Sequence, residues 1–335
     1  MGYRVVSTSP SFGKFVTEPV EHLRSNGCAV ELRPELKTED LIAENLGDAD
    51  AVLVGFEPIT AKVIAAAKKL RVVAKHGAGV DNIDIAAATK AGVVGVSAAG
   101  VNSEAVAEST IGLFLALARS IPMADKEVRA GGWPRFAGLE LAKKTVGIVG
   151  FGQIGRLVAA RLSGFDMKVL AHDAFVSADA AKKLGAELVS LDRLLAESDF
   201  VSLHIPLTKE TRGLIGADQL KRMKKSAFLV NVSRGGTVDE QALYEALKAK
   251  VIGGAALDVF EKEPLPADSP LRDERIASRL RLFPHVASAA QATRLSPDPN
   301  VGMAGRTVQA VIDVLEKRHD GDPKKMPYVV NKEAF

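Results

Sequence analysis

The sequence predicts an α/β protein built from two doubly wound, parallel-sheet domains. Over the first hundred residues, short β-branched runs alternate with helix-like segments, and a second series of the same kind begins at Thr145. Alternation of strand and helix is typical of a parallel sheet with helices on both faces. The length of 335 residues is also consistent with about two domains.

The composition is that of an ordinary soluble globular protein. Hydrophobic residues make up 47% of the chain and charged residues 25%, which is enough to form a substantial core. The formal net charge is only +3 and the basic pairs are scattered, so we expect no nucleic-acid surface. Cys28 is the single cysteine, which excludes a disulfide within the chain and a cysteine metal cluster. No metal site is predicted.

The N-terminal segment and the apolar runs predict a cytoplasmic protein without a membrane partner. The first fifteen residues, "MGYRVVSTSPSFGKF", lack the basic start and apolar stretch of a signal peptide. The longest strongly apolar run, 111–118, is far too short to span a bilayer.

The two series give the expected strands. Those of the first are 4–8, 29–33, 51–55, 71–75 and 93–97. Those of the second are 145–150, 168–173, 187–190, 199–203, 227–232, 252–258 and 279–283. Helix-like segments such as 60–70 lie between the strands, and another, 305–318, lies in the tail.

Between the two series, residues 102–121 predict one long helix. Asn102 or Ser103 can cap its start, and Pro122 lies just past its expected end. Because the segment is apolar on nearly every face, we expect it to be buried between domains or subunits. The Gly- and Pro-containing stretch 129–138, which holds the only tryptophan, predicts a loop.

A glycine pattern at the start of the second series predicts a dinucleotide site. Gly150, Gly152 and Gly155 have G-x-G-x-x-G spacing, directly after an apolar strand and at the start of a helix. The first glycine would form the tight turn, the second would admit a pyrophosphate, and the third would allow close packing of helix and strand. The anion would bind at the helix N-terminus.

The next strand ends at Asp173, 23 residues after Gly150. A carboxylate at this point accepts hydrogen bonds from a ribose 2′-hydroxyl and repels a 2′-phosphate. No arginine follows in "HDAFVSAD". The sequence therefore favours NAD over NADP as the cofactor.

Polar residues follow the later strands of the second series. His204, Arg234, Asp258 and His285 each lie at or just after a predicted strand, and Glu263 follows Asp258 closely. The carboxyl ends of parallel strands share one edge of the sheet, where ligands of doubly wound folds bind. We therefore expect these side chains to gather where the nicotinamide projects.

The chain resembles the D-isomer-specific 2-hydroxyacid dehydrogenases over nearly its whole length. Seven motifs occur in the family's order: "HGAGVDNID" (76–84), "VNSEAVAE" (101–108), "GIVGFGQIG" (147–155), "SLHIPLT" (202–208), "NVSRGG" (231–236), "ALDVFEKEP" (256–264) and "PHVAS" (284–288). Within the family it is most similar to the phosphoglycerate dehydrogenase and hydroxypyruvate reductase branches.

The resemblance implies a catalytic trio of Arg234, Glu263 and His285. The planar fork of a guanidinium can hold both the carboxylate and the carbonyl of a 2-oxo acid. Hydride addition builds negative charge on the carbonyl oxygen, and a histidine can protonate it. A partnered carboxylate fixes the ring and stabilises its charged form. Arg234 would be the substrate clamp, with the two following glycines leaving room for substrate, His285 the acid/base and Glu263 the residue that tunes it.

The resemblance also implies the contacts around the trio. The substrate carboxylate would bind Ala78 and Gly79, with Lys75 and His76 close by, in a cleft between the domains. His204 is either a cofactor contact or a loop histidine whose hydrogen bonds are satisfied. The implied cofactor contacts are Gly150, Gly152, Gln153, Ile154, Gly155, Asp173, His204, Pro206, Thr211, Val232, Ser233, Asp258, His285 and Ser288.

The implied organisation is a discontinuous, flavodoxin-like catalytic domain (1–100 with 290–335) and an NAD-binding Rossmann domain (101–289), assembled as a homodimer. The expected reaction is the NAD-dependent interconversion of a D-2-hydroxy acid and its 2-oxo acid. The substrate could be 3-phosphoglycerate or a glycerate or hydroxypyruvate-like acid, although the loop 54–60 has no basic residue for a phosphate. The alternatives are an NAD-sensing corepressor and a catalytically silent NAD-binding scaffold of the same fold.

Overall fold

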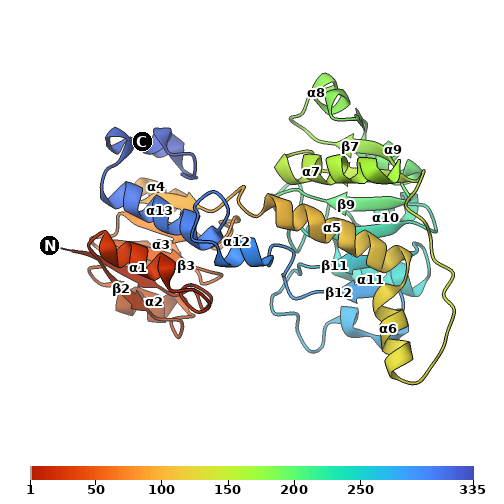
Figure 1. The fold of residues 1–335 in the computed structure, drawn as a ribbon, viewed down its shortest axis with the longest axis horizontal. Helices are drawn as coiled ribbons and strands as arrows, with labels where there is room; N and C mark the ends of the chain where they lie inside the picture. Colours follow the sequence, from red (N-terminus) through yellow and green to blue (C-terminus); the bar gives the residue numbers. More distant parts are fainter. Residues whose placement is uncertain (1) are drawn as a thin grey trace. The chain divides into compact units, whose positions relative to one another are not determined.

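The computed structural model describes residues 2–335 and consists of two compact units. Unit 1 comprises residues 2–102 together with 289–335, and unit 2 comprises residues 103–288. Figure 1 shows unit 1 in red and orange with the blue C-terminal segment, so two distant parts of the chain form this one unit.

Unit 1 is built on a five-stranded parallel sheet in the order β2-β1-β3-β4-β5. This is the flavodoxin-like order, in which the sheet is extended first to one side and then to the other. The strands are β1 (Tyr3–Ser7), β2 (Cys28–Leu32), β3 (Ala51–Val54), β4 (Val72–Lys75) and β5 (Val94–Ser97). The helices of its first segment are α1 (Glu18–Ser25), α2 (Glu39–Leu46), α3 (Ala61–Ala66) and α4 (Ile85–Lys90).

Helices cover both faces of this sheet. On one face, α2, α3 and α4 pack on side chains such as Val6 and Val52. On the other face, α1 and the tail helix α13 (Met303–Leu315) pack on Val5, Leu53 and Ala74. Strands buried on both faces read as continuous apolar runs, which explains why the sequence showed them clearly.

Unit 2 contains a seven-stranded parallel sheet in the order β12-β11-β10-β9-β6-β7-β8. The strand order reverses between β6 and β9, as in a dinucleotide-binding fold. The strands are β6 (Thr145–Val149), β7 (Lys168–His172), β8 (Ala186–Leu188), β9 (Phe200–Leu203), β10 (Phe228–Asn231), β11 (Gly254–Leu257) and β12 (Leu280–Leu282). All twelve predicted strands are found, each within two residues of its expected bounds.

Two layers of helices sandwich the sheet of unit 2. Helices α5 (Ser103–Ala118) and α7 (Gln153–Leu162) share one core with the sheet, whereas α9 (Leu191–Glu197), α10 (Ala217–Arg222) and α11 (Glu240–Lys248) share another. Helix α8 (Ala178–Lys183) and the short 3₁₀ segments η1 (Ser163–Phe165), η2 (Pro270–Arg272) and η3 (Glu274–Ile276) complete the unit. The predicted fold class, two parallel-sheet α/β domains, is confirmed.

The predicted helix over 102–121 is wrong at its C-terminal end. Helix α5 stops at Ala118, and a second helix, α6 (Ile121–Arg129), follows at a bend of 59°. Ser120 has a left-handed backbone (φ 51°), and Pro122 sits in the first turn of α6. Proline is favourable at the start of a helix, so Pro122 opens the second helix instead of marking the end of the first.

The tail is joined to the edge of the first sheet. After α12 (Gln291–Leu295) and α13 come η4 (His319–Gly321), η5 (Pro323–Lys325) and η6 (Lys332–Ala334). Ser97 donates a backbone hydrogen bond to the carbonyl of Tyr328, and the side chain of Asn331 accepts one from the backbone of Gly95. The final segment therefore lies beside β5.

Among residues 2–335, no single helix has the length and hydropathy to cross a membrane; only the bent pair α5 and α6 meets that criterion together, by length and composition.

Candidate active site

The turn after β10 positions Arg234. Asn231, at the end of this strand, is buried, and its amide side chain donates to the carbonyl of Arg234 (2.9 Å) and to the hydroxyl of Thr237 (3.1 Å). Its oxygen accepts from the backbone and the hydroxyl of Ser233, at 3.0 and 2.7 Å. An asparagine that bonds to its own turn in this way fixes the backbone. This role of Asn231 was not predicted from the sequence. The available signal was an asparagine, in "NVS", directly after an apolar run.

The two glycines after Arg234 serve the packing of loops. A Cβ at Gly235 would lie 1.8 Å from the carbonyl oxygen of Phe260, so the backbone of the next loop fills that space. Gly236 has a φ of 75°, which favours glycine. The expectation that these glycines leave room for substrate is therefore wrong for Gly235, whose role is to let the loop carrying Glu263 approach.

Glu263 and His285 form a hydrogen-bonded pair in unit 2. His285 Nδ1 lies 2.7 Å from Glu263 Oε2, and Glu263 Oε1 accepts from the backbone of Phe260 at 3.0 Å. Burial alone would raise the pKa of Glu263, but the hydrogen bond and charge of His285, the Phe260 N–H and the charge of Arg234 outweigh burial and lower it. The three residues of the predicted trio thus act on one another within one unit.

Asp258 holds the loop that carries His285. Its two carboxylate oxygens accept hydrogen bonds from the backbone of Val286 (2.8 Å) and Ala287 (2.7 Å). His285 itself has a left-handed backbone (φ 54°). Residues other than glycine keep this conformation only when the surrounding structure enforces it. Burial raises the pKa of Asp258, and these hydrogen bonds only partly offset that effect. The geometry shows a positioning role for Asp258, in addition to the cofactor contact implied by the resemblance.

The glycine turn after β6 has the shape that a dinucleotide requires. Gly150 has a φ of 93°, and a Cβ there would lie 2.5 Å from the carbonyl of His204. A Cβ at Gly155 would lie 2.2 Å from the Gly150 carbonyl, whereas one at Gly152 would meet no other heavy atom within 4 Å. Gly152 caps α7, so the space lies in front of that helix's N–H groups. The residues therefore fit a bound pyrophosphate.

Asp173 links the end of β7 to this turn. One carboxylate oxygen accepts from the backbone of Phe151 (2.7 Å), and the other accepts from Phe175 (2.8 Å) and Val176 (3.1 Å). Burial alone would raise the pKa of Asp173, but these three hydrogen bonds and the charge of Arg156 lower it. The group is therefore ionised at neutral pH, as repulsion of a 2′-phosphate requires.

His204 is neutral at neutral pH, because burial lowers its pKa to about 3. Its Nε2 lies 3.0 Å from Ser202 Oγ, whereas its Nδ1 is buried and makes no hydrogen bond with the described residues. One of the two ring nitrogens therefore has a hydrogen-bond partner, so His204 is not a fully hydrogen-bonded loop histidine.

The other implied cofactor contacts lie on the same strand-end loops or on α7. Thr211 donates to the carbonyl of Pro206 at 2.6 Å, which ties their loop together after β9. Val232 and Ser233 are buried just after β10, and Ser288 follows the His285 loop. Gln153 and Ile154 form the first turn of α7.

Ala78 and Gly79 belong to unit 1, in the loop after β4. Lys75, the last residue of β4, is buried and donates to Asn82 Oδ1 (2.8 Å) and to the carbonyl of Gly55. It thereby joins the loops that follow β3 and β4. This arrangement makes Lys75 a support for the Ala78–Gly79 loop.

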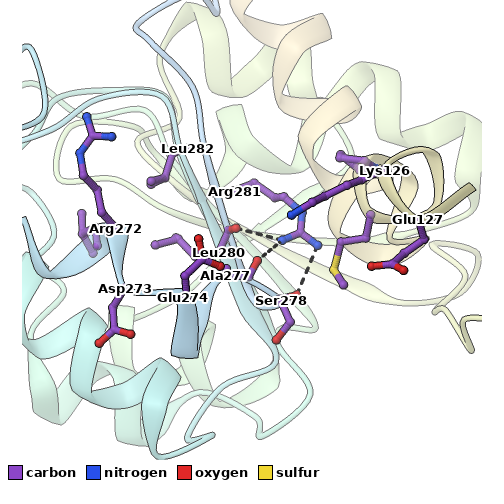
Figure 2. A pocket seen from close by; sticks show the side chains of 13 residues that line it. Lys126, Glu127, Arg272, Asp273, Glu274, Ala277, Ser278, Leu280, Arg281 and Leu282 are labelled. Atoms are coloured by element: carbon purple, nitrogen blue, oxygen red, sulfur yellow. Dashed lines mark hydrogen bonds between the residues drawn. The ribbon is translucent and has the colours of Figure 1, made fainter. Parts of the chain in front are cut away.

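Unit 2 also contains a cavity of about 550 Å³ between α6 and the segment 271–282 (Figure 2). Arg281 lies in its wall and donates to the carbonyls of Ala277 (2.7 Å), Leu280 (2.9 Å) and Ser278 (3.3 Å). Burial lowers the pKa of Arg281. None of the residues that line this cavity belongs to the predicted site.

Comparison with known proteins agrees with this geometry. The family model described as "D-isomer specific 2-hydroxyacid dehydrogenase, NAD binding domain" matches residues 111–287, which lie in unit 2. The glycine turn, the ionised strand-end carboxylate and this match define unit 2 as a doubly wound NAD-binding domain. The chain belongs to the D-isomer-specific 2-hydroxyacid dehydrogenase family, as the sequence motifs predicted.

Individual relatives extend the similarity to unit 1. The chain is 45% identical to a D-3-phosphoglycerate dehydrogenase of Archaeoglobus fulgidus over 289 residues, covering 85% of this chain and 53% of that protein. It thus spans about half the length of that relative. It is 43% identical to a glyoxylate reductase of Thermofilum pendens, covering 96% of this chain and 94% of that one. The crystal structure of the TT0316 protein from Thermus thermophilus superimposes with a TM-score of 0.82 at 32% identity, covering 98% and 99% of the two chains.

Asp173 yields a first prediction, on cofactor choice. We expect the wild type to prefer NADH over NADPH, and Asp173→Asn to reduce that preference about 10–100-fold, the effect of one hydrogen bond to a charged group. Asparagine keeps an oxygen for the backbone of the turn but loses the charge. Asp173→Ala should in addition weaken NADH binding, since it also removes the hydrogen bond that holds the backbone of Phe151 in the glycine turn. KM values for both cofactors provide the measurement, with Asp179→Asn in α8 as control; a wild type that prefers NADPH would contradict the assignment.

A second prediction concerns the Glu263–His285 pair. The Glu263 carboxylate fixes the orientation of the His285 ring through the 2.7 Å contact at Nδ1. Glu263→Gln keeps the size of the side chain but replaces a charge-assisted hydrogen bond with a neutral one, so kcat for reduction should fall about 10-fold while the KM for NADH changes little. Steady-state kinetics measures both parameters, and Glu261→Gln serves as control. An unchanged kcat in Glu263→Gln would show that the pair is structural.

Proposed function

We propose that this protein catalyses the NAD(H)-dependent interconversion of a D-2-hydroxy acid and the corresponding 2-oxo acid. The observation that carries the proposal is the 2.7 Å pair of His285 and Glu263, within the electrostatic influence of Arg234, at the carboxyl edge of a dinucleotide-binding sheet. Carbonyl reduction needs a hydride, which the cofactor would supply, a group that stabilises negative charge and a proton donor; the cation and the partnered histidine would provide the last two.

In this proposal each residue of the trio has a separate task. Arg234 binds the carboxylate and the carbonyl oxygen of the 2-oxo acid and stabilises the negative charge that develops on that oxygen. His285 gives a proton to the same oxygen, and in the opposite direction it removes the hydroxyl proton. Glu263 holds Nδ1 and so directs the other ring nitrogen toward substrate. The nicotinamide, when bound, supplies or accepts the hydride at C2.

Unit 1 is proposed as the substrate-binding domain. The backbone N–H groups of Ala78 and Gly79 would bind the substrate carboxylate, and unit 1 would meet the trio across a cleft. The chain passes between the units twice, after Asn102 and after Ser288. Two such passages can act as a hinge that closes over the substrate and excludes water.

The relatives' names guide the choice of substrates. They point to 3-phosphoglycerate with its 2-oxo counterpart and to glyoxylate. A glycerate or hydroxypyruvate-like acid fits the same chemistry. We also propose a cytoplasmic enzyme that acts on small acids without a nucleic-acid or membrane partner.

The direct test is NADH oxidation with a panel of 2-oxo acids: glyoxylate, hydroxypyruvate, 3-phosphohydroxypyruvate, pyruvate and 2-oxobutyrate. We expect turnover of at least one, and formation of the D-hydroxy acid as shown by chiral chromatography. Binding of NADH without turnover of any 2-oxo acid would instead favour the silent scaffold, and an L product would refute the stereochemical assignment.

A homodimer through unit 2 is the third prediction. Large apolar side chains are exposed on α6 and the loop after it: Ile121 is 53% exposed, Val128 50% and Trp133 81%. Such side chains close together in one segment are typical of an interaction surface. Light scattering at micromolar concentration should give twice the chain mass of 35.4 kDa. Trp133→Ser with Val128→Asp should weaken the dimer, whereas Phe175→Ser, which alters an exposed phenylalanine elsewhere in unit 2, should not; a monomeric wild type would exclude this interface.

A further inference from the structure

A histidine without a role in the proposed reaction lies at the carboxyl end of β4. His76 Nδ1 is 3.2 Å from Ser9 Oγ and 3.4 Å from Ser11 Oγ, and the ring meets that of Phe12 edge-on with centroids 5.6 Å apart. The backbone N–H of His76 donates to the carbonyl of Val54 at 2.8 Å. The two serines at Nδ1 and the ring of Phe12 thus hold the imidazole ring, and the backbone bond to Val54 holds the residue.

The second ring nitrogen, Nε2, has no hydrogen-bond partner among residues 2–335. His76 Nε2 is buried and unbonded, and so is the Nε of Arg294 on α12. Burial, the charge of Arg294 and that of Lys75 lower the pKa of His76 to about 4, so the ring is neutral at neutral pH. In the tautomer with its proton on Nδ1, facing the serines, His76 has an unused acceptor at Nε2, and Arg294 is close enough to act on the ring electrostatically.

The fold brings Arg294 to this edge of the sheet. Helix α12 packs against α13, and Thr307 of α13 reaches the carbonyl of Lys75 at 3.4 Å. The tail therefore meets the first segment directly beside His76.

Arg294 is half-buried, and in the described part of the chain no carboxylate forms an ion pair with it. Glu57, a buried carboxylate in the loop after β3, accepts hydrogen bonds from Gly55 N (2.7 Å) and Thr8 Oγ1 (3.1 Å) and forms no ion pair with Arg294. Partial burial of a guanidinium without a counter-ion is unfavourable. The cation is thus held in a position where an anionic ligand would stabilise it.

We propose that Arg294 is a specificity-determining residue that binds the distal end of the substrate, and that the preferred substrate is a 2-oxo acid with a second anionic group, carboxylate or phosphate. This inference rests on the proposed function, in which the first carboxylate binds Ala78 and Gly79. His76 lies two residues before Ala78, a span of at most about 7 Å, which is comparable with the length of a three- or four-carbon acid. His76 is the positioning residue for the guanidinium, and Ser9 and Ser11 orient His76.

The test compares acids of equal carbon skeleton that differ in distal charge. Oxaloacetate is paired with 2-oxobutyrate, and 3-phosphohydroxypyruvate with hydroxypyruvate, which separates a carboxylate from a phosphate. We expect the wild type to favour at least one anionic member about 10-fold or more in kcat/KM. Arg294→Gln should lower kcat/KM for that acid about 10–100-fold, the effect of a lost charge-assisted hydrogen bond, and change the neutral partner less than about 3-fold.

Further variants separate binding from a structural role. Arg294→Lys should keep part of the preference, since it keeps the charge, and His76→Gln should reduce it by raising KM rather than lowering kcat. Arg24→Gln on α1 is the matched control in the same unit and should change nothing. If Arg294→Gln does not fold, as judged by its thermal transition, Arg294→Lys and His76→Gln carry the test. Equal losses on charged and neutral acids in all folded variants would overturn the proposal.

Calorimetric titration with NAD⁺-saturated protein distinguishes this proposal from the proposed function. A 2-oxo acid cannot react with the oxidised cofactor, so the titration of oxaloacetate, 3-phosphohydroxypyruvate and their neutral partners reads binding alone. Arg294-dependent binding of an anionic acid without reduction of any 2-oxo acid would refute the proposed function and support only the binding of the distal anion by Arg294. Turnover with no preference for a distal charge, or with a preference that survives in Arg294→Gln, would refute the specificity role alone.

Discussion

Replacing His285 with alanine is expected to lower kcat for 2-oxo acid reduction about 10²–10⁴-fold, with a much smaller change in KM. In the proposed reaction His285 donates a proton, which matters mostly in the transition state, when negative charge has developed on the carbonyl oxygen. The ground-state complex would be held by Arg234 and the loop of unit 1, which the substitution leaves in place. Steady-state kinetics at saturating NADH measures both parameters.

The structure provides a control for this experiment. His22 is exposed on α1, and His22→Ala removes an imidazole without touching the site, so its kcat should match the wild type. His285→Ala leaves Asp258 and its hydrogen bonds to Val286 and Ala287 intact, so the loop should keep its conformation. A residual kcat within about 10-fold of wild type would mean that another group or water supplies the proton.

Arg234→Lys is expected to lower kcat/KM for the best 2-oxo acid about 10–100-fold, although it keeps the positive charge. A lysine presents a single ammonium group, whereas the guanidinium fork can bind a carboxylate and a carbonyl together. In the proposed reaction the group that binds the acid also polarises its carbonyl, so both substrate binding and the chemical step should suffer. The KM for NADH should change far less, since the dinucleotide is proposed to bind at the glycine turn and Asp173.

Arg222→Lys is the matched comparison. Arg222 forms a surface ion pair with Asp192 at 2.6 Å, and exposed pairs of this kind contribute about 0–1 kcal/mol to stability. This variant should retain wild-type kinetics. Were Arg234→Lys to behave in the same way, Arg234 would be no more than another surface arginine at a strand end.

The sheets could be predicted from the sequence because their physical signal is local. Strands buried on both faces must be apolar along their length, and each of the twelve is followed by a turn or a helix start. The trio could be expected to meet because β10, β11 and β12 are neighbours, and the carboxyl ends of neighbouring parallel strands share an edge. Arg234, Glu263 and His285 all follow these strands.

Other features depend on contacts that no local pattern contains. The role of Gly235 follows from the approach of the Phe260 carbonyl, 25 residues further along the chain. The pairing of Asp258 with the backbone of Val286 and Ala287 likewise depends on how two loops meet. The break after α5 was missed because a proline past an apolar run can end one helix or begin the next, and the left-handed Ser120 decides between them.

The division of unit 1 between two chain segments sets the order in which the protein can mature during its synthesis. Unit 2 is one continuous segment, so all of its strands and helices can be in place while later residues are still being added. The sheet of unit 1 emerges first but lacks α13, the helix that packs over Val5, Leu53 and Ala74 on one of its faces. A nascent chain that stops short of residue 303 would therefore hold a finished nucleotide-binding domain beside a sheet with one apolar face open to solvent, a target for chaperones and proteases until translation has delivered the tail.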